Sequence, residues 1–192
     1  ISEPQLAPPG AGLPLPELLI GRLIFGFRSL TGNREAFNRR FVSEREKIGG
    51  LVESCSAGSL GRRVLIKRPR GLEDSSRYWS VLMTLDHLRI VNSQLVQVFE
   101  RLPQGKQPDR EADTATVKPG AAVTREVIAE FEISCDELIS AVAKVPDLKT
   151  KTCFRHPWFG PMDAHAWHAL AGGHMAIHRS QIERIIAGMN QK

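Results

Sequence analysis

Hydrophobic residues recur at helical spacing in four stretches of the chain. Each stretch carries large apolar side chains three or four positions apart, which gathers them on one face of a helix. The predicted helices run from Arg34 to about Cys55, from Asp74 or Ser75 to about Leu102, from Thr124 onward, and from Asp163 to about Ile186. Sustained strand alternation is missing, apart from a possible extended piece at residues 63–67. We therefore predict an all-α fold, a four-helix bundle.

The first 33 residues have a different character. Five prolines and two glycines within residues 1–16 exclude a helix or a central strand, so we expect an extended arm. Residues 17–27 are rich in Leu, Ile and Phe and predict a short helix that docks on the bundle or on another subunit, as in a homodimer. The expected organisation is an arm with a short hydrophobic segment at residues 1–33 and a bundle at residues 34–192.

Composition narrows the classes of partner. The chain is 42% hydrophobic and 24% charged, which is an ordinary globular balance. Its net charge of +5 would suit an acidic partner, and five basic residues cluster at Arg62, Arg63, Lys67, Arg68 and Arg70. This cluster contains no aromatic side chain to stack on bases, so nucleic acid is disfavoured and a small-molecule substrate is preferred.

Cysteine usage and hydropathy both favour a cytoplasmic protein. The three cysteines are odd in number, far apart and free of any C-x-x-C spacing, which argues against a disulfide framework and a zinc-thiolate site. The longest apolar run, at residues 13–27, is too short and too interrupted by charges and prolines to span a membrane. We expect a cytoplasmic protein without a membrane span.

Four of the six histidines lie in the last predicted helix, and helical geometry separates them. At about 100° per residue, His174 and His178 share the apolar face that also carries Trp167. His168 lies roughly 120° from His174, and His165 lies roughly 180° away, so both are expected to be solvated or peripheral.

Two imidazoles one helical turn apart can reach one metal ion, but an isolated H-x-x-x-H is more often a pair of buried histidines satisfied by neighbours. His87 changes this balance, because it lies in the apolar stripe of the second predicted helix. Burying three unpaired imidazoles in one bundle is costly unless they share a cation. The pattern predicts a metal site at His87, His174 and His178.

Three segments resemble the DinB-like superfamily. GGHMAIHRSQIERI at residues 172–185 is similar to its final-helix signature, WSVLMTLDHL at 79–88 to its second-helix histidine segment, and HPWFGPMDAHAW at 156–167 to a loop found in one branch. The resemblance implies an up-up-down-down bundle with the same three-histidine site. It also implies one of several activities: metal-dependent transfer of low-molecular-weight thiols, maleylpyruvate isomerisation with a thiol cofactor, or hydrolysis. Many members have no established activity.

Other residues complete the predicted site. Gln181 is placed to hydrogen-bond a ligand histidine or a bound water. Trp167 is expected to line the pocket. His156 and Trp158 are expected either to line its entrance or to serve as packing residues of the loop. Arg179 is expected to contact an anion at the mouth unless it is a plain surface residue. Asp86 points about 100° away from His87 and is interpreted as a solvated or interhelical carboxylate.

Three functions follow from these expectations. The first is an enzyme that activates an exogenous thiol or water at one divalent ion, as a thiol transferase or a hydrolase, with zinc or nickel preferred and iron or copper compatible with histidine ligands. The second is a non-catalytic bundle that binds metal or ligand in a structural, sensing or stress-related role. The third is a metal-free interaction protein that uses the basic cluster.

Overall fold

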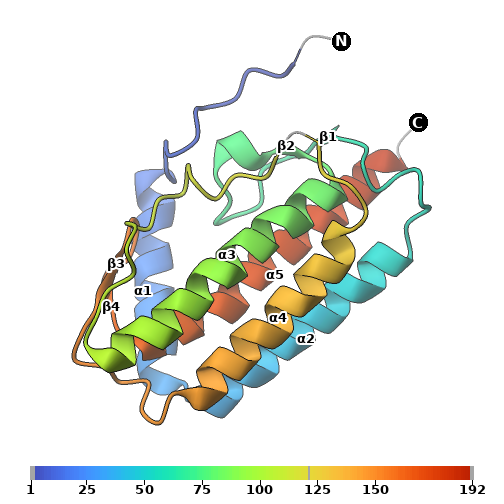
Figure 1. Cartoon of the computed structure of the whole chain (residues 1–192). Coiled ribbons are helices and arrows are strands. Elements are labelled where there is room, and N and C mark those ends of the chain that lie inside the picture. The colour runs from blue at the N-terminus through green and yellow to red at the C-terminus, as the bar shows by residue number, and fades with distance from the viewer. Residues whose placement is uncertain (1–2, 121, 191–192) are drawn as a thin grey trace.

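Five α-helices account for most of the chain in the computed structural model, which describes residues 3–120 and 122–190 (Figure 1). Their bounds are α1 at Leu15–Thr31, α2 at Arg34–Glu53, α3 at Val81–Arg101, α4 at Val127–Lys144 and α5 at Ala164–Met189. Polar side chains begin three of them: Asn33, Ser80 and Asp163 each accept a hydrogen bond from a backbone N–H of the first turn. The predicted start at Asp163 is confirmed.

Helices α2 to α5 form the predicted four-helix bundle, but their directions differ from the expected order. Contacts pair Asn38 with His168 and Glu44 with Arg179, so α2 and α5 run parallel. Helices α3 and α4 also run parallel to each other and antiparallel to the first pair, which gives an up-down-down-up order (Figure 1). An up-up-down-down bundle needs two lengthwise crossovers. This bundle has one such crossover, between α3 and α4, whose described residues 102–120 and 122–126 run back along the bundle.

Short strands and 3-10 turns occupy the connections. Strand β1, Val64–Leu65, pairs antiparallel with β2, Tyr78–Trp79, which confirms the extended piece near residues 63–67. The predicted helix start at Asp74 or Ser75 was wrong, because these residues form the 3-10 turn η1, Asp74–Ser76, and α3 begins only after Ser80. A second 3-10 turn, η2, at Leu102–Gln104, ends α3.

The loop before α5 is a small hairpin that the sequence pattern did not predict. Strand β3, Phe154–His156, pairs antiparallel with β4, Gly160–Met162. Gly160 has a φ of 77°, a left-handed conformation that glycine adopts at little cost. With only three residues a strand, the hairpin is too short to show an alternating pattern.

The buried face of α3 is broader than the predicted stripe. Helical spacing from His87 predicts that Val91 and Gln94, four and seven positions later, also face inward, but Gln94 is exposed and Val91 is only partly buried. Leu85 and Leu88 are fully buried instead. Helix α3 packs against both α4 and α5, so one narrow stripe underestimates the surface that it must bury.

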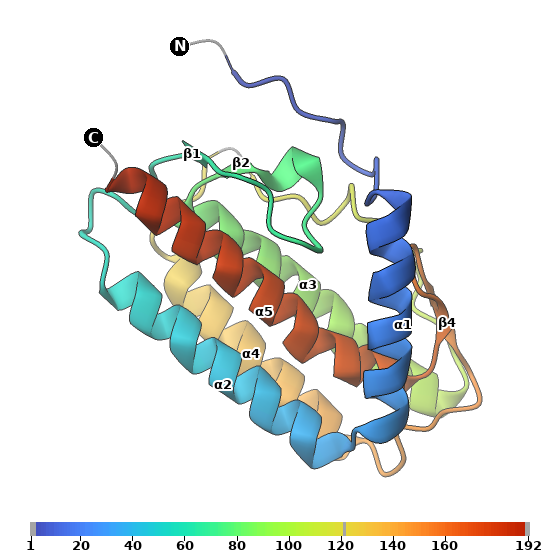
Figure 2. The same ribbon diagram turned by 180° about the vertical axis from the view of Figure 1, so that it is seen from behind.

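Helix α1 crosses the outside of the bundle over the first half of α5 (Figure 2). It is longer than the predicted segment at residues 17–27. The Glu17 carboxylate accepts hydrogen bonds from the Arg68 guanidinium and from the Gly71 backbone N–H, and Arg22 Nε donates to the Trp158 carbonyl oxygen. Before it, the proline-rich arm is non-helical, as expected, and Ala7 N donates to the Asp74 carboxylate.

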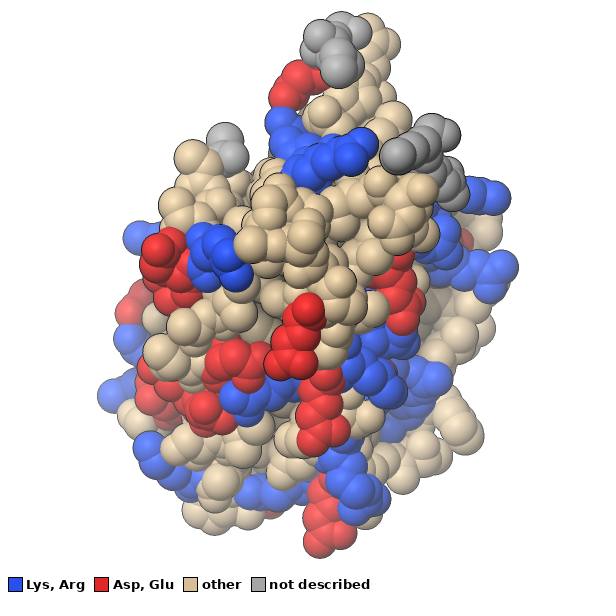
Figure 3. Space-filling view, turned by 90° about the vertical axis from the view of Figure 1, so that its right-hand side faces the viewer, with Lys and Arg blue, Asp and Glu red and all other residues tan. Residues whose placement is uncertain are grey.

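Charges of both signs are interspersed on the face at the right of Figure 1 (Figure 3). Two members of the basic cluster are paired with acids, Arg63 with Glu3 and Arg68 with Glu17. This pairing weakens the cluster as an uninterrupted basic surface. Of the helices described, none is both long and apolar enough to cross a bilayer.

Candidate metal centre

The structure brings His87 of α3 together with His174 and His178 of α5. One potential ligand atom of each residue lies within 4.8 Å of those of the other two. The ring centroids are 4.4 to 5.0 Å apart, and the Nε2 atoms of His87 and His174 are separated by 3.1 Å. His87 and His178 are buried and His174 is partly exposed, so the cluster is not sealed from solvent. The predicted convergence of these side chains is confirmed.

The orientation of His87 is fixed by the crossover that connects α3 to α4. His87 Nδ1 lies 2.7 Å from the backbone carbonyl oxygen of Val117, which can only accept a hydrogen bond. Nδ1 must therefore carry the proton. In the neutral imidazole this leaves a lone pair on Nε2, which points toward the other two histidines.

A chain of two hydrogen bonds fixes His178 in the same way. Gln181 Nε2 donates to the Ser76 carbonyl oxygen at 2.7 Å, so its Oε1 faces His178 Nδ1, also at 2.7 Å. Because this oxygen accepts, His178 Nδ1 carries the proton and Nε2 is left with its lone pair. Gln181 lies where the sequence predicted a supporting hydrogen bond, and it is fully buried.

Burial keeps these imidazoles neutral. It lowers the pKa of His87 to about 4, and burial followed by the neighbouring imidazoles lowers the pKa of His174 and of His178 well below the usual range. Converging lone pairs on neutral nitrogens repel one another unless they share a proton or a cation. The donor set therefore fits a divalent ion that prefers nitrogen ligands, and binding it would require no proton release.

The surroundings of the cluster include residues that the sequence reasoning missed. The Trp79 ring lies 5.3 Å from the ring of His87 and stacks at 6.2 Å on that of His178. Lys118 Nζ is 5.5 Å from the centre of the Trp79 ring and donates to the Glu73 carboxylate at 2.7 Å. Trp79 could have been found from the sequence, because it is the first residue of the segment WSVLMTLDHL that resembles the DinB-like superfamily. Nothing local in the sequence marks Glu73 or Lys118 as partners 45 positions apart.

Glu73 is buried in the α2–α3 connection and hydrogen-bonds to the N-terminal arm and to the α3–α4 crossover. Its carboxylate accepts hydrogen bonds from Lys118, Thr114 Oγ1 and the Gly10 backbone N–H. Burial alone would raise its pKa, but the ion pair with Lys118 and these donors outweigh burial and lower the pKa. This carboxylate is therefore committed to the arm and the crossover, and it is not free to act as a base.

His156 and Trp167 contact each other beside the cluster. Their rings are 5.3 Å apart, and Trp167 Nε1 donates to the Phe154 carbonyl oxygen. His156 Nδ1 accepts hydrogen bonds from the backbone N–H groups of Trp158 and Phe159, so its proton is on Nε2. Burial lowers the pKa of His156 to about 4, which leaves a neutral imidazole with an N–H donor. A positive charge on His156 would add to burial and His87 in lowering the pKa of His174.

The two remaining histidines lie outside the cluster, but one expectation about them was wrong. His168 is buried, with Nε2 at 2.9 Å from Asn38 Oδ1 and its ring edge-on to Phe37 and Phe99. The reason is that α5 is covered by α2 and α3 on different sides, so the face away from His174 is also interior. His165 is peripheral, with Nε2 at 3.0 Å from the Ser29 carbonyl oxygen.

Two charged residues have structural partners in place of the expected roles. Arg179 Nε donates to Glu44 of α2 at 2.5 Å and also pairs with Glu183, so it links α2 to α5 and does not offer a free anion contact. Asp86 is buried rather than solvated. It accepts hydrogen bonds from Arg89 and from the Gly120 backbone N–H, and thus anchors the crossover to α3.

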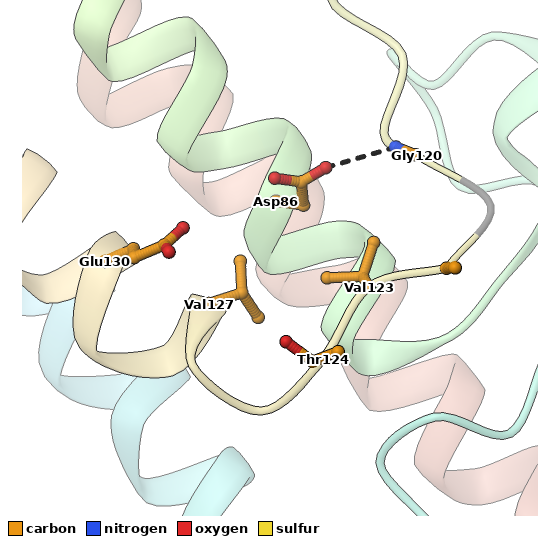
Figure 4. Close-up of a pocket in the computed structure, with 7 residues that line it drawn as sticks. Asp86, Gly120, Val123, Thr124, Val127 and Glu130 are labelled. Carbon is orange, nitrogen blue, oxygen red and sulfur yellow. Dashed lines mark hydrogen bonds between the residues drawn. The ribbon is translucent and has the colours of Figure 1, made fainter.

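A pocket of about 190 Å³ lies beside Asp86, between α3 and the start of α4 (Figure 4). The carboxylates of Asp86 and Glu130 face it, with Val127 on its wall (Figure 4). None of the three clustered histidines lines this pocket. It is therefore a separate hollow and not the entrance to the histidine cluster.

Comparison with known proteins places this geometry in a family. A sequence model described as the DinB superfamily matches residues 40–182, which is well over half of the chain. The chain belongs to the DinB superfamily. The DinB match contains α3 and α4, α2 from Arg40 onward and α5 up to Ile182, and therefore all three clustered histidines and Gln181, but it excludes α1.

A solved structure agrees with the DinB fold. The chain is similar to the one described as "Crystal structure of TT2238, a four-helix bundle protein", with 21% identity and a TM-score of 0.56, over 78% of this chain and 97% of that one. At this identity the likeness shows the fold alone. The search of curated proteins gave no significant match.

Proposed function

We propose that this DinB protein is a divalent-metal-dependent enzyme. His87, His174 and His178 hold the ion, and an exogenous thiol or water attacks a small electrophile beside it, as in a thiol transferase or a hydrolase. The observation that carries the proposal is the convergence of the three rings, with the Nε2 lone pairs of two of them fixed by Val117 and Gln181. Zinc and nickel are the preferred ions, because imidazole nitrogens suit both.

In the proposed enzyme the metal ion would activate the nucleophile, and the chain would orient the ligands and the substrate. An ion bound by His87, His174 and His178 would lower the pKa of a thiol or water and so supply a nucleophile near neutral pH. The chain supplies orientation: Val117 and Gln181 fix two of the ligand rings. His156 supplies a neutral N–H donor, which can bind an oxygen or sulfur of the substrate without adding charge.

One observation favours a second candidate function, a metal-binding bundle with a structural or sensing role. Among residues 3–120 and 122–190, Glu73 and Asp86 are the buried carboxylates near His87 in sequence or space, and both are engaged in ion pairs. Neither is free to accept a proton from a nucleophile. An enzyme of this design must therefore rely on the ion itself to acidify the thiol or water.

Two experiments, elemental analysis and then a turnover assay, test the proposal. Protein purified without metal-affinity resin should contain one equivalent of zinc or nickel, and His174→Ala should contain none. The matched control is His165→Ala, on the same helix but outside the cluster, which should retain the metal. A panel of small thiols and electrophiles should then show turnover that is lost in His174→Ala. Bound metal without any turnover would favour the structural or sensing role.

Gln181 gives a finer test of the site. We expect Gln181→Leu to weaken metal binding by about 10- to 100-fold, because His178 loses the partner that fixes its tautomer and ring orientation. Metal affinity would be measured by competition with a chromophoric chelator. Gln94→Leu, at an exposed position of α3, is the matched control and should bind normally. Equal affinities for both variants would remove Gln181 from the site.

A further inference from the structure

Helix α1 presents a continuous apolar face to solvent. Seven large side chains on it are between 50% and 88% exposed, and no residue of the helix is buried. They are Leu15, Leu19, Ile20, Leu23, Ile24, Phe27 and Leu30. At about 100° per residue they cover roughly half of the helix circumference, centred on Leu23, with no charged residue among them.

The orientation of this face is set by specific contacts on the opposite side of α1. Glu17 is held by Arg68 and the Gly71 backbone N–H, and Arg22 by the Trp158 carbonyl oxygen. The Phe25 ring packs on that of Phe159, with centroids 4.5 Å apart. A helix held only by its hydrophobic surface would turn that surface toward the bundle. Here polar anchors hold the apolar face outward.

The exposed area matches what one protein contributes to a specific interface. Counting about 150 Å² for each fully exposed large side chain, the low end for aromatic residues, the seven residues offer on the order of 700 Å². A standard interface takes about 800 Å² from each partner. Monomeric proteins rarely expose a contiguous apolar patch larger than a few hundred Å² without using it.

We propose that this face is covered by α1 of a second copy of the chain, in an antiparallel pair about a two-fold axis that passes near Leu23. Leu19 and Phe27 lie four positions on either side of Leu23. A 180° rotation about an axis near Leu23 therefore places Leu19 of one copy beside Phe27 of the other. An isologous dimer requires such self-complementarity. The antiparallel arrangement also brings the Arg28 end of one helix beside the Glu17 end of the other and opposes the helix dipoles.

A membrane surface fits the same face less well. Helices that lie in the interface carry a polar face rich in Lys and Arg, which contacts the lipid headgroups. Helix α1 carries two basic residues: Arg22 is engaged with the Trp158 carbonyl oxygen, and Arg28 is exposed. On the same side as Arg22, Glu17 and Phe25 contact the protein itself, so this side is not rich in Lys and Arg. The proposed dimer uses no residue of the histidine cluster, so its test is independent of the proposed enzymatic function.

Analytical ultracentrifugation of the full chain tests the proposal. The wild-type chain should sediment as a dimer, and Leu23→Glu should sediment as a monomer with an unchanged circular dichroism spectrum, since Leu23 is 75% exposed. The melting temperature of the wild type should rise with protein concentration, because the dimer stabilises the folded chain, and that of Leu23→Glu should not. Ile133→Glu is the matched control, because Ile133 is an exposed apolar residue on α4, and it should remain dimeric. A dimeric Leu23→Glu variant would place the interface elsewhere.

Cross-linking tests the arrangement in a background with Cys55→Ser and Cys153→Ser. Leu23→Cys should form a disulfide-linked dimer on oxidation, because the two copies meet at the axis. Leu30→Cys lies about 10 Å from the axis along the helix and should not cross-link. Efficient cross-linking at both positions would overturn the antiparallel arrangement. A wild-type monomer that binds vesicles of phosphatidylcholine and phosphatidylglycerol would overturn the dimer in favour of a lipid surface.

Discussion

Exhaustive chelation should lower the melting temperature of the wild-type protein by roughly 10 °C. A ligand bound only by the folded state stabilises it by about 4 kcal/mol when its concentration is a thousand times its dissociation constant. In a chain of this size each kcal/mol shifts the melting temperature by about 2–4 °C. The ion would join α3 to α5, and removing it leaves three neutral imidazoles in contact. Differential scanning calorimetry with and without chelator measures the shift.

His174→Ala separates this effect from other actions of the chelator. The variant should melt at the same temperature with and without chelator, because it has no complete site to empty. His165→Ala should keep the full sensitivity of the wild type. If a sample shown to contain metal melts unchanged after chelation, the ion does not stabilise the fold.

Acidification should unfold the metal-free protein between about pH 6.5 and pH 4. Burial lowers the pKa of His87 and of His168 to about 4, while in the unfolded chain each titrates near 6.5. Below pH 6.5 the unfolded state therefore takes up protons that the folded state does not, and stability falls as the pH falls. Each residue costs up to about 3 kcal/mol by pH 4. With His174 and His178 added, the loss approaches a total stability of about 5–15 kcal/mol.

Circular dichroism as a function of pH, in the presence of chelator, follows this transition. His168→Gln removes one titrating group outside the metal cluster and keeps a side chain that can hydrogen-bond Asn38. Its acid midpoint should move to lower pH, since one proton fewer is taken up on unfolding. An unchanged midpoint would mean that His168 is already protonated in the folded protein.

The bundle and its histidine cluster could be predicted because both depend on helical periodicity. Apolar spacing located the four bundle helices, and the spacing of His174 and His178 with the inward position of His87 selected the cluster. Helix boundaries were less secure where several polar residues compete as caps. Ser80 begins α3, whereas Asp74 and Ser75 form a 3-10 turn before it.

Features that depend on long-range packing could not be predicted. The burial of His168 follows from helices on two sides of α5, which a single helical wheel does not represent. The carbonyl of Val117 that orients His87 comes from an irregular crossover 30 positions away. Backbone groups leave no trace in the side-chain pattern, so this contact is visible only in three dimensions.

The parallel pairing of α2 with α5 has a consequence for how the protein folds. Asn38 meets His168 across 130 positions, and Glu44 meets Arg179 across 135. Such contacts are made only after most of the chain has been drawn into one loop, and proteins dominated by distant contacts cross their folding barrier slowly. This bundle should therefore fold more slowly than one of equal length whose neighbouring helices are joined by tight turns. The histidine cluster, which needs α3, α5 and the crossover together, should be among the last parts to form.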